Sequence, residues 1–202
     1  MINRIGVIYQ DINSVAFLEG LRDRLKCAAK FIKPPAAIGK SRVLTRRQAR
    51  LAWLYFQGQG VDLVVRFTDA DRHSWQDTKR EELQRVPSEA QSIWICGVAV
   101  ENVEDWLCLD EAYLAQKLDV DVADLPHAHD RSGFIKRRIA SLRGETHTNN
   151  HVIADIVRGA SSSVFRRWFR DVAFRNFYTE CRAAATQADC ETPNELATSE
   201  YA

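Results

Sequence analysis

The stretch 63-LVVRFTDADRHSW-75 decides the fold, because an apolar run leads directly into two aspartates. The run at 61–67 has the length and composition of a strand buried on both faces of a parallel sheet. In an extended chain, residues i and i+2 point the same way, so Asp69 and Asp71 are predicted to face one point beyond the strand. Ligands of open parallel sheets collect at that edge.

Strand-like and helix-like segments alternate from the first residues to about residue 118. Short apolar, β-rich runs predict strands at 4–9, 61–67 and 92–100, while 36–43 is ambiguous and compatible with a short strand. Apolar residues three and four apart predict helices at 14–32, 45–57 (inner side Leu51, Leu54 and Tyr55), 75–85 and 103–118. This alternation is typical of an α/β fold in which helices flank a parallel sheet.

The pattern changes after Leu118, which predicts an α/β domain at 1–118 and a mostly helical C-terminal region at 119–202, with a frayed acidic tail from Ala183. The run 164–178 interleaves arginines with aromatic residues. Its aromatic residues recur at helical spacing, so we expect most of them in the core or in a subunit interface of a homo-oligomer. Its arginines remain candidates for a DNA-binding or partner-binding face: Arg166, Arg167, Arg170 and Arg175.

The overall composition excludes several classes of protein. Among 202 residues the formal net charge is +1, which argues against a protein that coats polyanions. No two of the five cysteines form a CxxC pair, which argues against a zinc ribbon. The first residues lack the apolar core of a signal peptide, and no apolar run approaches the length of a membrane span. We therefore expect a cytoplasmic protein without a membrane partner.

Further polar residues follow the other predicted strands. Gln10 and Asp11 come directly after the first strand, and Glu101 and Glu104 come after the run at 92–100. Each has an ordinary explanation, as a capping residue or as favourable charge in the first turn of a helix. Their shared position after successive strands nevertheless indicates one cluster of carboxylates. Clustered anions stay ionised only beside a cation, and Mg²⁺ prefers carboxylate and water oxygens.

An acid after the first strand, a DxD after a later strand and a further acid after the next one resemble the TOPRIM domain. The segments that carry the resemblance are 4-RIGVIYQDINSVAFLEGLRDRL-25, 64-VVRFTDADRHSW-75 and 101-ENVEDWLCLDEAYLA-115. The last is most similar to small stand-alone TOPRIM proteins of bacterial anti-phage operons, which are related to OLD-type nucleases. The resemblance implies a nuclease that depends on Mg²⁺ or Mn²⁺ and acts in antiviral defence. It also implies a separate ATPase partner, since the chain itself has no P-loop sequence.

The resemblance also implies roles for individual residues. Asp69, Asp71 and Glu101 correspond to metal ligands, and Gln10, Asp11 and Glu104 to catalytic positions. The family normally has glutamate where this chain has Gln10, and an amide cannot exchange a proton. Positive side chains flanking the DxD are predicted to bind nucleic acid, DNA in the first place: Arg66, Arg72, His73 and Lys79.

Three functions remain open at this point. The first is a metal-dependent nuclease. The second is a catalytically degenerate TOPRIM subunit that binds nucleic acid or an ATPase without cutting, which Gln10 favours. The third is a phosphoesterase that acts on a small phosphate ester.

Overall fold

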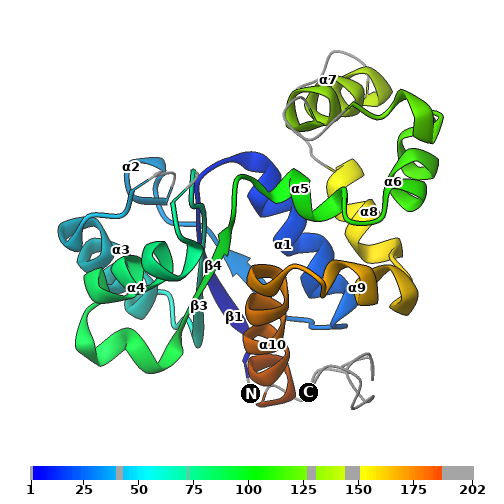
Figure 1. Cartoon of the computed structure of the whole chain (residues 1–202). Helices are drawn as coiled ribbons and strands as arrows, with labels where there is room; N and C mark the ends of the chain where they lie inside the picture. Colours follow the sequence, from blue (N-terminus) through cyan, green and yellow to red (C-terminus); the bar gives the residue numbers. More distant parts are fainter. Residues whose placement is uncertain (1, 40–42, 72, 127–130, 144–150, 188–202) are drawn as a thin grey trace.

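The fold is built on a sheet of four parallel strands. The computed structural model describes residues 2–39, 43–71, 73–126, 131–143 and 151–187, and Figure 1 shows the arrangement. The strand order is β2-β1-β3-β4, with β1 at Arg4–Tyr9, β2 at Lys30–Ile32, β3 at Leu63–Asp69 and β4 at Trp94–Ala99. All neighbouring strands pair in parallel, so the predicted α/β fold is confirmed.

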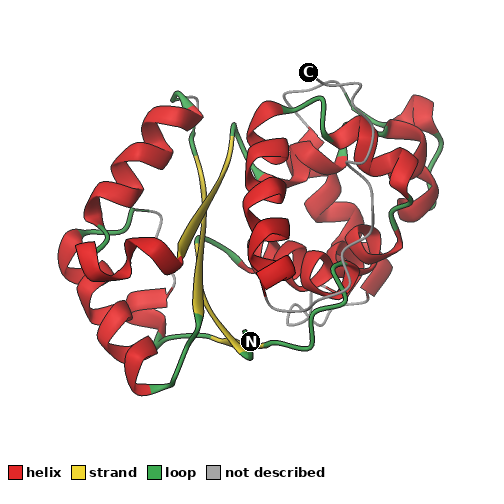
Figure 2. Ribbon diagram, turned by 90° about the horizontal axis from the view of Figure 1, so that it is seen from below, coloured by secondary structure: helices red, strands yellow, loops and turns green. Residues whose placement is uncertain are grey.

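Helices cover both faces of the sheet, which stands between two helical layers in Figure 2. One layer contains α2 (Ala36–Gly39), α3 (Arg46–Gly58) and α4 (Trp75–Arg85). The other contains α1 (Ile12–Arg24), α5 (Val103–Leu107), α6 (Glu111–Leu118), α7 (Arg131–Arg143), α8 (His151–Gly159), α9 (Ser162–Trp168) and α10 (Val172–Gln187). Short 3₁₀ turns occur at Ser88–Ile93 and Val122–Asp124. None of the helices described here has the length and apolarity needed to cross a bilayer.

Two predicted helices are shorter than the apolar spacing indicates. The first ends at Arg24, because Lys26 adopts a left-handed φ of 49° and the chain then forms β2, which pairs with β1. The predicted helix at 103–118 is divided into α5 and α6. Asp110 starts α6 by accepting a hydrogen bond from the backbone N–H of Tyr113, and this cap interrupts the helical backbone.

The inner side of α3 also differs from the prediction. Leu51 and Leu54 are 42% and 53% exposed. The buried side chains of the helix are Ala49, Ala52, Trp53 and Phe56. Gly6 on β1 makes room for Phe56, because a Cβ atom there would lie 2.9 Å from the ring. Small residues and one aromatic ring therefore bring α3 close to the sheet, and the two leucines face outward.

The C-terminal helices complete the same hydrophobic core as the sheet. Phe165, Trp168 and Phe174 are fully buried in one cluster with Val7 and Phe67 of the central strands. The expectation that the aromatic residues of 164–178 lie in a core is confirmed for these residues. Helix α10 continues to residue 187, so the first part of the predicted frayed tail is helical, and residues 188–202 lie outside the described residues.

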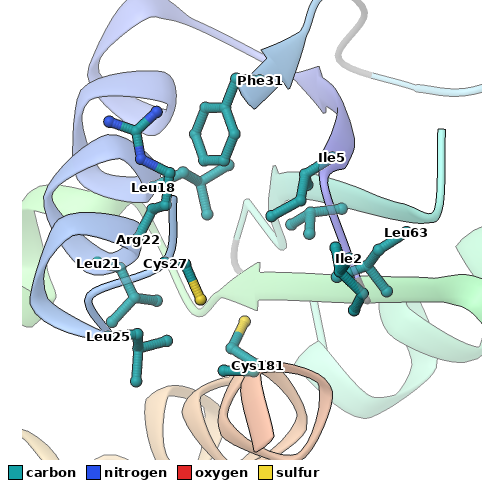
Figure 3. Close-up of a pocket in the computed structure, with 12 residues that line it drawn as sticks. Ile2, Ile5, Leu18, Leu21, Arg22, Leu25, Cys27, Phe31, Leu63 and Cys181 are labelled. Atoms are coloured by element: carbon teal, nitrogen blue, oxygen red, sulfur yellow. The ribbon is translucent and has the colours of Figure 1, made fainter. Parts of the chain in front are cut away.

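A small apolar cavity of about 50 Å³ lies where this core reaches the amino ends of the strands. Figure 3 shows Leu18 and Leu21 of α1, Ile5 of β1 and Cys181 of α10 around it. The cavity is too small and too apolar for a phosphate-bearing substrate.

A buried ion pair fastens α4 to β3. The Nε of Arg66 donates to Glu82 at 3.0 Å, and neither residue has more than 3% of its surface exposed. The second carboxylate oxygen of Glu82 accepts from Arg85 at 2.7 Å. The prediction that Arg66 binds nucleic acid is wrong, because a side chain without exposed surface cannot reach a phosphate.

We expect Glu82→Ala to lower the free energy of unfolding by about 3–5 kcal/mol, because it leaves the Arg66 charge buried without its partner. Denaturant unfolding measures this value. The matched control is Glu81→Ala, which removes an exposed ion pair with Arg85 and is expected to cost less than about 1 kcal/mol. Equal losses in the two variants would contradict the role assigned to the buried pair.

Candidate functional site

Three neighbouring strands deliver polar side chains to one edge of the sheet. Asp69 is the last residue of β3, Gln10 and Asp11 directly follow β1, and Glu104 lies in α5 after β4. Because β1, β3 and β4 are adjacent and parallel, their carboxyl ends share this edge. Residues that are 35 or more positions apart in the chain thereby become neighbours, so that the charges of Asp11 and Glu104 act on Asp69.

Asp69 is the centre of the cluster. Its Oδ1 atom is buried and has no hydrogen-bond partner among the described residues. Burial and, to a smaller extent, the negative charges of Asp11, Glu104 and Asp71 raise the pKa of Asp69 from its ordinary 3.8 to about 7, while Lys136 acts in the opposite direction. The carboxylate form of Asp69 is therefore costly unless positive charge is added.

Glu104 is buried completely beside Asp69. Its Oε1 accepts a hydrogen bond of 2.5 Å from Asn13 and lies 3.5 Å from the Nζ of Lys136. Its Oε2 has no partner among the described residues. Burial raises the pKa of Glu104, and Lys136 counteracts part of that rise. A second buried carboxylate oxygen is thus available to a ligand.

Gln10 and Asp11 have structural contacts as well as a place at the edge. The Oε1 of Gln10 accepts from the Thr68 hydroxyl at 3.1 Å and from the Asp69 N–H at 3.2 Å, which fastens the end of β1 to the end of β3. Asp11 caps α1, since its Oδ1 accepts from the N–H of Ser14 at 2.9 Å and from its hydroxyl at 2.8 Å. Both residues help to hold the edge together.

The remaining predicted metal ligands differ from each other. Asp71 follows Asp69 in a tight turn with a φ of 49°, and its charge acts on Asp69. Glu101 is exposed and is not among the charges that shift the pKa of Asp69. The structure therefore joins Asp71 to the cluster and leaves Glu101 outside it.

A groove of about 810 Å³ runs from this cluster along α4. Asp69, Asp71 and His73 line it at the strand end. Arg80 and Arg85 line it further along, but they are paired with acids of the same helix. Acidic partners thus neutralise the charge of both arginines that line the groove, which leaves little positive charge there to bind a phosphate.

The other predicted nucleic-acid-binding residues differ in their surroundings. The Nζ of Lys79 donates to Asn176 at 2.6 Å and to Glu180 at 2.5 Å, which links α4 to α10 and neutralises its charge. Arg72 lies outside the described residues. His73 is exposed in the groove and remains a candidate.

Sequence reasoning missed Asn13 and Lys136. Asn13 lies two residues after Asp11, in the first turn of α1, and is buried there, which no pattern in the sequence indicates. Lys136 comes from α7, which lies beside α5. No spacing in the sequence connects Lys136 to Glu104, because the contact joins segments 32 residues apart through the fold.

The residues present fit a hydrated divalent cation. Among the described residues, no three His, Cys, Asp or Glu side chains gather into a complete set of metal ligands. Two buried carboxylates nevertheless offer oxygens without partners, and both are disfavoured as anions in the absence of added positive charge. Mg²⁺ is commonly held by one or two carboxylates and keeps several waters, so this donor set suits it.

Comparison with known proteins adds no further information on the site. No protein-family model matches the chain, and no similar curated protein or solved structure was found.

The raised pKa of Asp69 predicts how stability changes with pH in a metal-free buffer. A raised pKa means that the folded protein holds the proton more tightly than the unfolded chain. This contribution to stability is complete below pH 3.8 and is lost as the pH rises to about 7. In wild type, the free energy of unfolding should therefore fall as the pH rises over this range. We expect this fall to be smaller in the Asp69→Asn variant, which should be more stable than wild type at about pH 8.

Denaturant unfolding in EDTA at several pH values measures the effect, with Glu101→Gln as the control, because Glu101 is exposed and lies outside the cluster. A wild-type protein that gains stability between about pH 5 and pH 8 would contradict the expected sign.

Proposed function

We propose that the protein is a Mg²⁺- or Mn²⁺-dependent nuclease of TOPRIM type that hydrolyses phosphodiester bonds, with DNA as its substrate. The observation that supports this proposal most is the pair of buried carboxylate oxygens without partners on Asp69 and Glu104. Such oxygens are costly in a folded protein unless they serve a ligand. A groove lined by Asp69 and Asp71 opens at the same edge, and a polymer can approach the cluster from there.

In this proposal the chain's own residues have separate tasks. Asp69 and Glu104 hold the cation, with Asp71 beside them, and a bound cation neutralises phosphate charge and lowers the pKa of water. Asn13 and Lys136 fix the Glu104 carboxylate through its Oε1. Gln10 orients the end of β3, and Asp11 is the proposed acceptor of a proton from the attacking water, because an amide cannot take that role.

The biological setting is proposed from the resemblance alone. Small stand-alone TOPRIM proteins imply a role in defence against phage, together with a separate ATPase subunit.

A second candidate is a subunit that binds nucleic acid or an ATPase without cutting. The observation that favours it is the environment of Gln10, whose side-chain oxygen is occupied by Thr68 and by the Asp69 N–H. The residue at the position of the family's glutamate thus has a structural contact and no proton to exchange. The two candidates differ in a single measurable property, which is turnover.

We expect the double variant Asp69→Ala, Asp71→Ala to lose at least about 100-fold in cleavage of labelled DNA with Mg²⁺ or Mn²⁺, because metal ligation supplies several kcal/mol. Gel analysis of products over time measures the rate. Asp77→Ala is the matched control, since Asp77 lines the same groove but is paired with Arg80 at 2.6 Å. Cleavage by the double variant at the wild-type rate would exclude the proposed mechanism.

Gln10→Glu distinguishes the two candidates. A glutamate keeps acceptor oxygens for Thr68 and Asp69 and adds a group that exchanges protons, which contributes about 10²–10⁴-fold where a catalytic base is missing. If the chain is a degenerate subunit, wild type will bind DNA without cutting it and Gln10→Glu will gain cleavage. Gln10→Ala serves as the control and should remain inactive. Cleavage by wild type at least as fast as by Gln10→Glu would argue against the second candidate.

A further inference from the structure

The first two turns of α3 carry three arginines whose charge is not neutralised within the described chain. Arg46, Arg47 and Arg50 are exposed, and none makes an ion pair or hydrogen bond among the described residues. The whole helix contains no acidic residue. The arginines of α4 differ, because Arg80 and Arg85 are both paired with acids one turn away. The positive charge of α3 is therefore available to a partner.

This charge occupies an unfavourable place for the helix itself. Arg46 and Arg47 stand in the first turn, where the helix dipole already presents positive charge. A capping box of Thr45 and Gln48 and four buried side chains on the inner face hold the helix in place nonetheless. The arginines add nothing to this packing, because they point away from it. An anionic ligand would relieve the repulsion.

The arginines lie at the same edge of the sheet as the carboxylate cluster. Val43, three residues before Arg46, lines the groove that contains Asp69 and Asp71. The opposite end of α3 lies at the amino edge, where Arg4 of β1 donates to the carbonyl oxygen of Gln59 at 2.5 Å. The helix thus runs antiparallel to the strands (Figure 1). Its first turns, which carry the arginines, follow directly after the segment in which Val43 lines the groove.

We propose that Arg46, Arg47 and Arg50 bind backbone phosphates of a nucleic acid. These phosphates flank the phosphodiester bond that lies at Asp69. This inference rests on the proposed function and narrows its substrate to a polymer, because the arginines flank the groove and do not line it. Guanidinium groups bind phosphate through paired N–H donors, and such contacts position a duplex without reading its sequence. The surface takes over the role that sequence reasoning gave to Arg66.

The test measures DNA binding in EDTA, where no cleavage occurs. The variants are the triple substitution Arg46→Gln, Arg47→Gln, Arg50→Gln and a control triple in the other helical layer, Arg166→Gln, Arg170→Gln, Arg175→Gln. The control removes the same charge from the other arginine-rich surface that the sequence offers for DNA, so the two candidate surfaces are compared directly. The anisotropy of a labelled 20-base-pair duplex is recorded across a salt series. We expect the α3 triple to reduce the slope of log K against log salt by about 2–3, at about 0.9 per lost phosphate contact. The control triple should keep the wild-type slope.

Three results would overturn the inference. The first is a wild-type chain that does not bind the duplex. The second is an α3 triple with the wild-type slope, which would favour an acidic protein partner for this surface. The third is an equal reduction of the slope in the two triples. A variant with lysine at all three positions should keep most of the slope, and thermal melting checks that all variants are folded. Cleavage with Mg²⁺ is scored separately, so binding through α3 without cleavage would sink the nuclease proposal and leave this inference standing.

Discussion

The cost of burying negative charge governs the edge of this sheet. Asp69 and Glu104 each have a carboxylate oxygen that is removed from water and receives no hydrogen bond from the described chain. The parallel pairing of three strands forces these groups together, because a strand that ends at this edge delivers its next residues to the same place. The chain thus maintains an arrangement that is unfavourable by itself, and such arrangements are concentrated at functional sites.

Several contacts keep the two carboxylates from moving apart to relieve this cost. Gln10 ties the end of β1 to the backbone of Asp69, and the N–H of Ala70 donates to Ala99 at 2.8 Å. Below the edge, the buried pair of Arg66 and Glu82 fixes α4 to β3. The strands cannot splay without breaking hydrogen bonds in a region of low dielectric, where each is worth more than at the surface. The edge is therefore preorganised before any ligand arrives.

The sequence predicted those elements whose limits are marked locally. The helix at Trp75–Arg85 agrees with its prediction because the Ser74 cap and Pro87 define both ends. The first helix was predicted too long, since apolar spacing continues past Lys26 while the backbone does not. Asp11, Asp69 and Glu104 were predicted to lie together from their shared position after successive strands, and the effect of Asp11 and Glu104 on the pKa of Asp69 agrees with that prediction. Lys136 and the burial of Arg66 depend on partners that only the folded chain supplies, so no local pattern contains them.

The shared core has a consequence for how the protein is made. A nascent chain that has reached Leu118 contains all four strands, but the ribosome has not yet delivered the aromatic rings of α9 and α10 that cover β4 and α1. Until they emerge, Phe17, Phe67 and Trp106 lack part of their apolar surroundings. Synthesis from the amino end thus delays completion of the core until α9 and α10 have been made, and the growing polypeptide exposes apolar surface that favours aggregation throughout that interval.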